Sequence, residues 1–185
     1  MDINSKDENL EVFADFAKDI KLVVMDVDGV LTDGKIYQGI GETQIKAFHS
    51  KDGMGIRLLQ KYDFKIALLT GGSGDVISKR ARGLGIEILK FGVEDKFDAL
   101  IKLQKELKIA PSETAFLGDD INDLPVIPSV RFFATPSDGH PACKESAHWI
   151  GQFKGGNGFV REFSDYLIFG KGLNPYLPLK TSNEA

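Results

Sequence analysis

The chain has 185 residues, which fits one domain built around a single hydrophobic core. Its 23 basic and 27 acidic residues give a net charge of −4, so no general positive field would attract nucleic acid. The longest apolar runs are far below the ~20 residues of a membrane-spanning helix, and we expect neither a membrane segment nor a secretory signal. One cysteine, Cys143, cannot form an internal disulfide, which favours a cytoplasmic location.

The predicted elements begin with a short amphipathic helix within residues 1–19, which leads into the domain. A buried strand is predicted at 21–27, because this short stretch contains the uninterrupted apolar run "LVVM", is rich in β-branched residues and is closed by Gly29. Further strands are predicted at 64–70, 86–91, 114–119 and 130–135, with helices at 54–62, 76–84, 96–107 and 122–127. This alternation predicts an α/β fold with a three-layer, doubly wound parallel sheet.

Two segments depart from the alternation. Residues 34–48 have the pattern of a β-hairpin with its turn at 39–41, which would protrude from the sheet directly after the first strand. Residues 170–185 contain two prolines and end in polar residues, so we expect a flexible tail unless other residues hold it. We expect residues 1–185 to form one domain with these two additions.

Polar side chains follow four of the predicted strands. They are Asp26 and Asp28 after the first, Thr70 and Gly71 after the second, Lys96 at the helix after the third, and Asp119, Asp120 and Asp123 after the fourth. Ligands bind doubly wound sheets at the carboxyl ends of the strands, so these residues are expected to converge. Taken alone, the first aspartate pair is as typical of a turn, and Asp120 and Asp123 of a helix cap.

Converging carboxylates raise one another's pKa unless a cation compensates them, and Mg²⁺ prefers such oxygen ligands. Lys96 and Thr70 would supply the positive charge and the donors that a phosphoryl group needs. Asp26 is placed to attack phosphorus, and Asp28 to exchange a proton with the leaving group and with water. The pattern therefore predicts a Mg²⁺-dependent phosphoryl-transfer site.

These motifs, in this order, resemble those of the haloacid dehalogenase superfamily. They read "DVDGV" from Asp26, Thr70-Gly71, Lys96, and "GDDIND" from Gly118. The resemblance implies that Asp26 is the nucleophile and Asp28 the acid and base, with Thr70 and Lys96 also catalytic. It implies Mg²⁺ bound by Asp26, Asp119 and the Asp28 carbonyl, with Asp123 behind these ligands.

The spacing of the motifs leaves no room for a cap domain. The 41 residues between Asp28 and Thr70 are used by the hairpin and one helix, and the 25 between Thr70 and Lys96 by one helix and one strand. The stretches "DVDGVLTDGKIY", "KAFHSKDGMGIRLL" and "KGGNGFVRE" are similar to the small capless phosphatases of phosphorylated ulosonic acids. That similarity implies a homotetramer in which neighbouring subunits complete each site, with the hairpin as docking element and "KGGNG" and the tail near a neighbour's site.

The same resemblance implies a set of substrate-binding residues. They are Asp28, His49, Ser50, Lys51, Asp52, Gly53, Arg57, Gly71, Arg80 and Lys96. From the sequence alone, Arg57 and Arg80 are more typical of surface helices. One position departs from the pattern, since octulosonate phosphatases commonly have Arg directly after Thr-Gly, where this chain has Gly72.

The expected reaction is hydrolysis of 3-deoxy-D-manno-octulosonate 8-phosphate for lipopolysaccharide precursor synthesis. Because of Gly72, a nine-carbon ulosonate 9-phosphate is an alternative substrate, and a non-catalytic tetramerisation module of the same fold is an alternative role. A phosphoacceptor receiver domain is disfavoured, because no aspartate closes a strand between the acidic pair and Thr70. His140, His148, Cys143 and Trp149 have no zinc-ligand spacing and are interpreted as structural.

Overall fold

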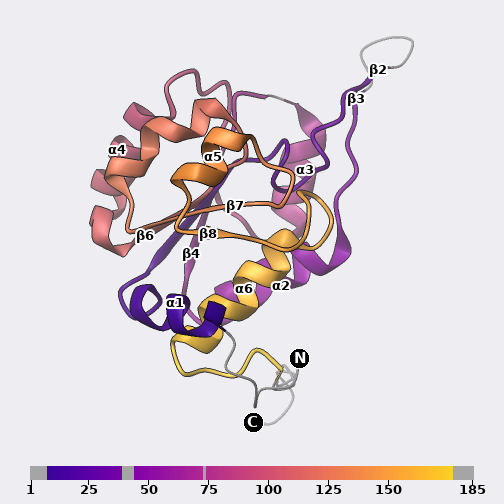
Figure 1. Cartoon of the computed structure of the whole chain (residues 1–185). Coiled ribbons are helices and arrows are strands. Elements are labelled where there is room, and N and C mark those ends of the chain that lie inside the picture. The colour runs from indigo at the N-terminus through magenta and orange to yellow at the C-terminus, as the bar shows by residue number, and fades with distance from the viewer. Residues whose placement is uncertain (1–7, 39–43, 73, 177–185) are drawn as a thin grey trace, which may run out of the picture.

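Six parallel strands form the central sheet of the computed structural model, which describes residues 8–38, 44–72 and 74–176 (Figure 1). The strands are β1 (Leu22–Met25), β4 (Lys65–Leu69), β5 (Ile88–Lys90), β6 (Thr114–Leu117), β7 (Phe132–Thr135) and β8 (Trp149–Ile150), in the order β5-β4-β1-β6-β7-β8. The chain proceeds from β1 outward to β5, then returns to β6 on the other side of β1. The predicted doubly wound parallel sheet is confirmed, with its switch point between β1 and β6.

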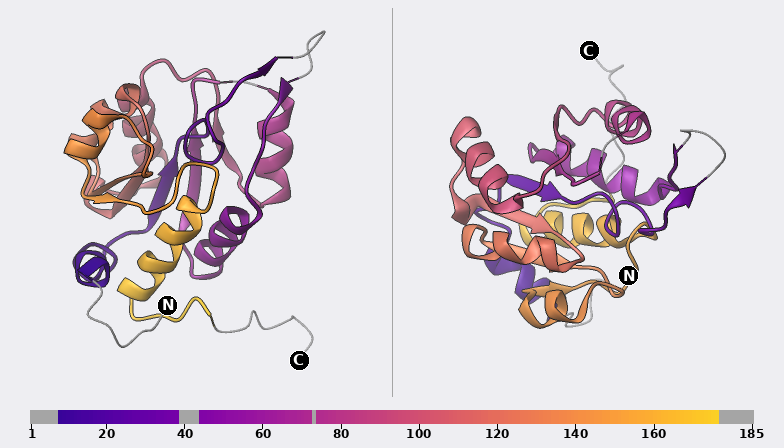
Figure 2. Two further views of the ribbon diagram at one scale, coloured as in Figure 1. Left: turned by 45° about the vertical axis from the view of Figure 1, so that its right-hand side comes forward. Right: turned by 90° about the horizontal axis from the view of Figure 1, so that it is seen from above.

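Helices cover both faces of this sheet (Figure 2). One face carries α1 (Glu8–Phe16), α2 (Ser50–Lys61), α3 (Asp75–Gly83) and α6 (Phe159–Gly170). The other carries α4 (Lys96–Leu107), the 3₁₀ helix η2 (Ile121–Ser129) and α5 (Pro141–Ser146), while the 3₁₀ turn η1 (Pro111–Glu113) precedes β6. These are the three layers that the alternating sequence pattern predicts.

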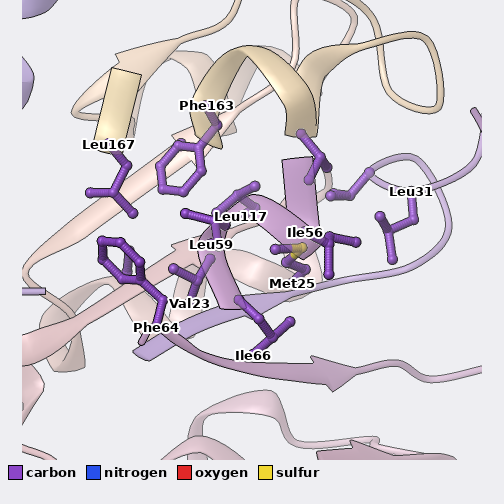
Figure 3. Close-up of a cluster of buried hydrophobic side chains, with 14 of the residues drawn as sticks. Val23, Met25, Leu31, Ile56, Leu59, Phe64, Ile66, Leu117, Phe163 and Leu167 are labelled. Carbon is purple, nitrogen blue, oxygen red and sulfur yellow. The ribbon is translucent and has the colours of Figure 1, made fainter. Parts of the chain in front are cut away.

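Strand β1 is buried on both faces, which explains its uninterrupted apolar sequence. Val23 and Met25 point into the core beneath α2 and α6, where they meet Leu59 and Phe163 (Figure 3). The alternate residues of the strand belong to the core beneath α4 and η2. Both cores end where the polar residues after the strand begin.

The N-terminal helix is part of the main core. The Phe13 ring of α1 lies 5.0 Å from Phe132, 5.2 Å from Trp149 and 5.4 Å from Tyr166, measured between ring centroids. Phe13 is completely buried, and α1 packs along α6. Aromatic contacts of this kind join the predicted helical lead-in to the sheet.

Several elements differ from the sequence prediction. The segment predicted as an α-helix at 122–127 is 3₁₀ instead, because Pro125 and Pro128 lack the N–H that an α-helix needs. Helix α2 begins four residues before the predicted 54, since Gly53 and Gly55 weaken the helical pattern there. Helices α5 and α6 and strand β8 were not predicted at all, and β8 is only two residues long.

The predicted hairpin is present as β2 (Tyr37–Gln38) and β3 (Gln44–Ile45), an antiparallel pair that extends away from the sheet (Figure 2). Its predicted turn, 39–41, lies outside the described residues. The first part of the expected flexible tail is held: the Tyr62 hydroxyl donates to the Asn174 carbonyl at 2.8 Å, and the Tyr176 ring packs on Phe169. The remainder of the tail, 177–185, is also outside the described part.

Candidate active site

Four predicted site residues lie together at the carboxyl edge of the sheet. Asp26 follows β1 directly, Thr70 follows β4, Asp119 lies two residues after β6, and Lys96 is the first residue of α4. Asp95 caps that helix by accepting the Asp98 N–H at 2.9 Å, which places Lys96 at the helix start. The sheet thus brings together groups that are up to 93 positions apart in the sequence.

Lys96 joins two of the aspartates. Its ammonium lies 3.0 Å from Asp26 Oδ2 and 2.6 Å from Asp123 Oδ1, and all three side chains are nearly or fully buried. The other oxygen of Asp26 accepts the Val27 N–H at 2.6 Å. Both oxygens of Asp26 are therefore held, which fixes the plane of the carboxylate.

Asp123 also organises the loop after β6. Its Oδ2 accepts the N–H groups of Asp119 and Asp120, at 3.0 and 3.2 Å. Asp120 caps the 3₁₀ helix by accepting the Ile121 N–H. The capping interpretation is thus observed for both residues, and Asp123 in addition contacts Lys96.

Three carboxylates form a group suited to a divalent cation. One oxygen each from Asp26, Asp119 and Asp123 lie within 4.8 Å of one another. Asp119 Oδ1 is buried, and no residue in the described part of the chain forms a hydrogen bond with it. A buried carboxylate oxygen without a partner is costly, and a hard cation would satisfy it.

The pKa values of the charged residues in this group also indicate a cation site. Burial raises the pKa of Asp26 to about 6, although the Lys96 charge opposes the shift. Burial, and then the negative charges of Asp26 and Asp123, raise the pKa of Asp119 to about 7. Burial alone would lower the pKa of Lys96, but the two neighbouring carboxylates raise it. One ammonium does not compensate three carboxylates, and a divalent cation would.

Two glycines allow the strand-end loops to approach this closely. Gly29 has φ +84°, and a Cβ there would lie 1.9 Å from Asp119 Oδ2. A Cβ at Gly118 would lie 2.5 Å from Asp123 Cγ. A side chain at either position would overlap the carboxylate group, so the glycines of the two motifs have a steric role.

Asp28 lies at the more open side of the group. Its Oδ1 accepts from Lys46 Nζ at 2.6 Å and from the Thr32 hydroxyl at 3.1 Å. Lys46 directly follows β3 of the hairpin, and the sequence analysis missed it because 17 residues separate it from Asp28 and no motif contains it. The base of the hairpin thus contributes a cation to the site.

The Thr70 loop faces Asp28. The Thr70 hydroxyl is buried and accepts the Gly72 N–H at 3.1 Å. A Cβ at Gly72 would lie 3.4 Å from both Asp28 Oδ2 and Thr70 Oγ1, and Gly72 has no left-handed backbone that would exclude a side chain. Gly71 is exposed beside them. The structure brings Asp28, Thr70 and both glycines together at one edge.

The start of α2 lies beside a pocket of about 500 Å³. Among its lining residues are His49, the residue directly before α2, and the exposed Lys51, together with Asn157 and Arg161 at the start of α6. Arg161 forms an ion pair with Asp165 at 2.9 Å. Ser50 is exposed at the same end of α2.

Asp52 links α2 to α6. Its side chain is 1 % exposed and accepts the N–H groups of Gly158 at 3.1 Å and Arg161 at 2.9 Å. Burial raises its pKa, while these hydrogen bonds oppose the shift. In this position Asp52 satisfies the first turn of α6, a role that its sequence context did not indicate.

The two predicted arginines lie at different depths. Arg80 donates to the His49 carbonyl at 3.3 Å, and a Cβ at Gly53 would lie 2.5 Å from its Nη2. Arg57 donates to the carbonyl of Gly83, the last residue of α3, at 3.0 Å. The structure therefore brings Arg80 to the start of α2 and leaves Arg57 at the far end of α3.

The "KGGNG" segment packs against the loop after β1 of its own chain. The Gly156 N–H donates to the Val30 carbonyl at 2.9 Å, and a Cβ at Gly155 would lie 1.7 Å from the Gly29 carbonyl oxygen. Asp138 accepts the Gly155 N–H. We expected this segment near a neighbour's site, and in the chain it supports the loop that carries Asp26 and Asp28.

Comparisons with known proteins agree with this arrangement. A model of the haloacid dehalogenase-like hydrolases matches residues 73–163. The 3-deoxy-D-manno-octulosonate 8-phosphate phosphatase of Yersinia pestis is 40 % identical over 152 residues, which cover 82 % of this chain and 81 % of that protein. Its crystal structure aligns with a TM-score of 0.85 at 37 % identity, covering 88 % of both chains.

A second structure holds ligands. The crystal structure of the Moraxella catarrhalis phosphatase of the same name, in complex with a magnesium ion, a phosphate ion and a KDO molecule, aligns with a TM-score of 0.84. It is 36 % identical, and the alignment covers 88 % of this chain and 92 % of that one.

The doubly wound α/β fold and the carboxylate group at the carboxyl ends of its strands are those of a hydrolase. The chain belongs to the haloacid dehalogenase-like hydrolases, and within them to the class of the phosphatases.

Proposed function

We propose that the protein is a Mg²⁺-dependent phosphatase that hydrolyses 3-deoxy-D-manno-octulosonate 8-phosphate to the free sugar acid and phosphate. The observation that carries the proposal is the group of Asp26, Lys96 and Asp119, in which a buried oxygen of Asp119 has no hydrogen-bond partner among the described residues. The names of its relatives, and the magnesium, phosphate and KDO bound by one of them, support this substrate. Lipopolysaccharide precursor synthesis in the cytoplasm is the corresponding setting.

The reaction divides into two steps on the aspartates of the first loop. An oxygen of Asp26 attacks phosphorus, and the bond to the sugar oxygen breaks as an aspartyl-phosphate forms. Asp28 gives a proton to the departing sugar oxygen and later takes one from the water that hydrolyses the intermediate. Lys96 and the Thr70 loop hold the phosphoryl oxygens while charge develops on them. Asp26, Asp119 and the Asp28 carbonyl would hold Mg²⁺, which would offset this charge, and Asp123 would orient the site from behind.

Cationic groups at the start of α2 suit a substrate that is also a carboxylate. Lys51 lines the adjacent pocket and Arg80 lies beside His49, so both are close to the place where the sugar acid would extend. Gly71 and Ser50 offer backbone and hydroxyl donors nearby. Asp52 and Gly53 would contribute by holding α6 and Arg80 in place, and Arg57 by tying α2 to α3.

The length of the substrate's carbon chain depends on the position that follows Thr70-Gly71. Gly72 leaves space beside Asp28 where the related octulosonate phosphatases commonly carry Arg. With this space, the protein would either bind the eight-carbon acid through other residues or accept a longer, nine-carbon acid. We propose the eight-carbon substrate, because the relatives that match most of the chain bear that name.

We also propose a homotetramer in which neighbours cover the open site. The hairpin exposes Ile36 and Ile45 to 86 % and 62 %, the two highest values among the large apolar side chains of the described residues. A chain without a cap leaves its site open to water unless another subunit covers it.

The nucleophile provides the first test. Asp26→Asn should abolish Mg²⁺-dependent hydrolysis of p-nitrophenyl phosphate, a loss on the order of 10⁴-fold or more for a nucleophile. Asp63→Asn is the matched control, because Asp63 is an exposed carboxylate before β4, at the opposite edge of the sheet, with φ 64° that Asn tolerates. Full activity of the Asp26 variant would disprove the mechanism.

The substrate is tested by kcat/KM for a panel of ulosonate phosphates of eight and nine carbons and simple hexose phosphates. The eight-carbon 8-phosphate should be the best substrate. A preference for the nine-carbon ester would reassign the substrate within the same class, and a preference for hexose phosphates would refute the ulosonate assignment.

A further inference from the structure

The carboxylate of Asp28 is held by the hairpin on one oxygen alone. Among the described residues, both of its hydrogen bonds go to Oδ1, from Lys46 Nζ at 2.6 Å and from the Thr32 hydroxyl at 3.1 Å. The other oxygen, Oδ2, faces the Thr70 loop, where a Cβ at Gly72 would lie 3.4 Å from it. The two oxygens therefore have different surroundings.

Lys46 is built into this position. Its side chain is 12 % exposed although it follows a strand of the protruding hairpin, whereas that of Lys35, on the other side of the hairpin, is 69 % exposed. The lysine end of the pair is shielded from water, while the Asp28 side chain is 36 % exposed. A charge-assisted hydrogen bond at 2.6 Å to one oxygen holds the carboxylate in one orientation. Lys46 thus differs from an ordinary hairpin lysine.

We propose that Lys46 is a positioning residue for proton transfer: it anchors Asp28 Oδ1, so that Oδ2 is the oxygen that exchanges the proton with the substrate. As the Asp26 oxygen bonds to phosphorus and the sugar oxygen leaves, the proton on Oδ2 moves to that sugar oxygen. In the second step a water proton moves to Oδ2 while the water oxygen bonds to phosphorus and the bond between phosphorus and the Asp26 oxygen breaks, which releases phosphate and the free Asp26 carboxylate. This inference rests on the proposed phosphatase function and adds a hairpin residue to it.

The leaving group distinguishes positioning from general structural support. A sugar alkoxide needs a proton to depart, whereas p-nitrophenolate departs as a stable anion without one. For Lys46→Met, kcat/KM should fall by about 10- to 100-fold for a sugar phosphate, part of the 10²–10⁴ that acid catalysis supplies. For p-nitrophenyl phosphate the fall should stay below about threefold, because kcat/KM covers only the steps through departure of the leaving group.

Three further variants complete the experiment. Lys46→Arg should recover most of the sugar-phosphate rate, because it restores a cation on Oδ1. Thr32→Val removes the second, neutral donor to the same oxygen. It should also lower kcat/KM more for the sugar phosphate than for p-nitrophenyl phosphate, but by a smaller factor than Lys46→Met. Lys35→Met removes the exposed ion pair with Asp33 and should change neither rate. Thermal unfolding of each variant shows whether the fold is retained.

Equal losses for both esters, or no loss for either, would overturn the positioning role of Lys46. If Lys46→Met does not fold, the Lys46→Arg and Thr32→Val variants test the positioning role instead, through the ratio of kcat/KM for the sugar phosphate to kcat/KM for p-nitrophenyl phosphate. Should the wild-type protein hydrolyse neither ester, the proposed function itself would fail, and the inference with it. Wild-type activity without the selective loss refutes the inference alone.

Discussion

The strand ends and the outer helices α2 and α3 hold their charged residues in different ways. At the strand ends, Lys96 is buried between Asp26 and Asp123, and each charge depends on the others. On the helices, Arg57 and Arg80 donate to backbone carbonyls and remain at least partly open to solvent. A change at the strand ends should therefore affect folding and chemistry together, while a change at either of these two arginines should cost little stability.

The largest effect is expected at Lys96. Lys96→Met would leave two carboxylates buried without their ammonium, which costs about 3–5 kcal/mol of unfolding free energy, and kcat should fall by at least ~10²-fold. Lys102→Met is the control, since Lys102 pairs with Asp98 at the same 2.6 Å on the same helix but is 70 % exposed. Denaturant unfolding and steady-state rates measure both. Similar costs for the two lysines would contradict the distinction between the regions.

The next effect concerns pH and metal. Because folding raises the pKa of Asp119 from 3.8 to about 7 and that of Asp26 to about 6, these groups favour the folded state most at low pH. Their contribution is lost as pH rises through 6 and 7, and Mg²⁺ should restore it. The melting temperature gained on adding Mg²⁺ should thus be larger at about pH 8 than at about pH 5.5.

Asp119→Asn serves as the control for this pH dependence, because it removes the group with the larger shift. The gain in melting temperature should then change less with pH than in the wild-type protein, because only Asp26 still titrates in this range. A gain that is equal at both pH values in the wild-type protein would show that the carboxylate group is not where the cation binds.

A smaller loss of stability is expected at the contact between α2 and α6. Asp52→Ala removes both hydrogen bonds at the start of α6 and should cost about 1–2 kcal/mol of unfolding free energy, as for other helix caps. Lys51→Ala, on the exposed neighbour, should leave that free energy unchanged. If Asp52→Ala lowered activity with no loss of stability, a direct substrate contact would replace the capping role.

The smallest effect separates the two arginines. Arg80→Gln should raise KM for the sugar-acid phosphate about three- to tenfold with kcat nearly unchanged, the pattern of lost uniform binding. Arg57→Gln should change KM less than about twofold, since Gly83 lies about 12 Å along α3 from its first turn. Equal increases for both variants would place Arg57 in the site after all.

Much of the strand-end region could be predicted because it depends on local pattern. Apolar runs closed by Asp26, Thr70 and Asp119 identify buried parallel strands and the edge at which they end. Parallel sheets place those ends side by side, so convergence followed from topology alone. For the residues on α2 and α3, no comparable rule says which side chains will meet. Asp52 lies in a recognised motif, yet it accepts a hydrogen bond from α6, an element that was not predicted.

The sequence by itself determined the order of strands and helices from α1 to β7, the acidic edge of the sheet and the lack of space for a cap. Tertiary structure decided the partners: Lys46 on Asp28, Asp52 on α6, and the glycines at 155 and 156 on the loop after β1. The physical reason is the distance along the chain over which each kind of interaction acts. Periodicity and turn chemistry act over a few residues, whereas hydrogen bonds and ion pairs between distant segments exist only after the sheet and helices have packed.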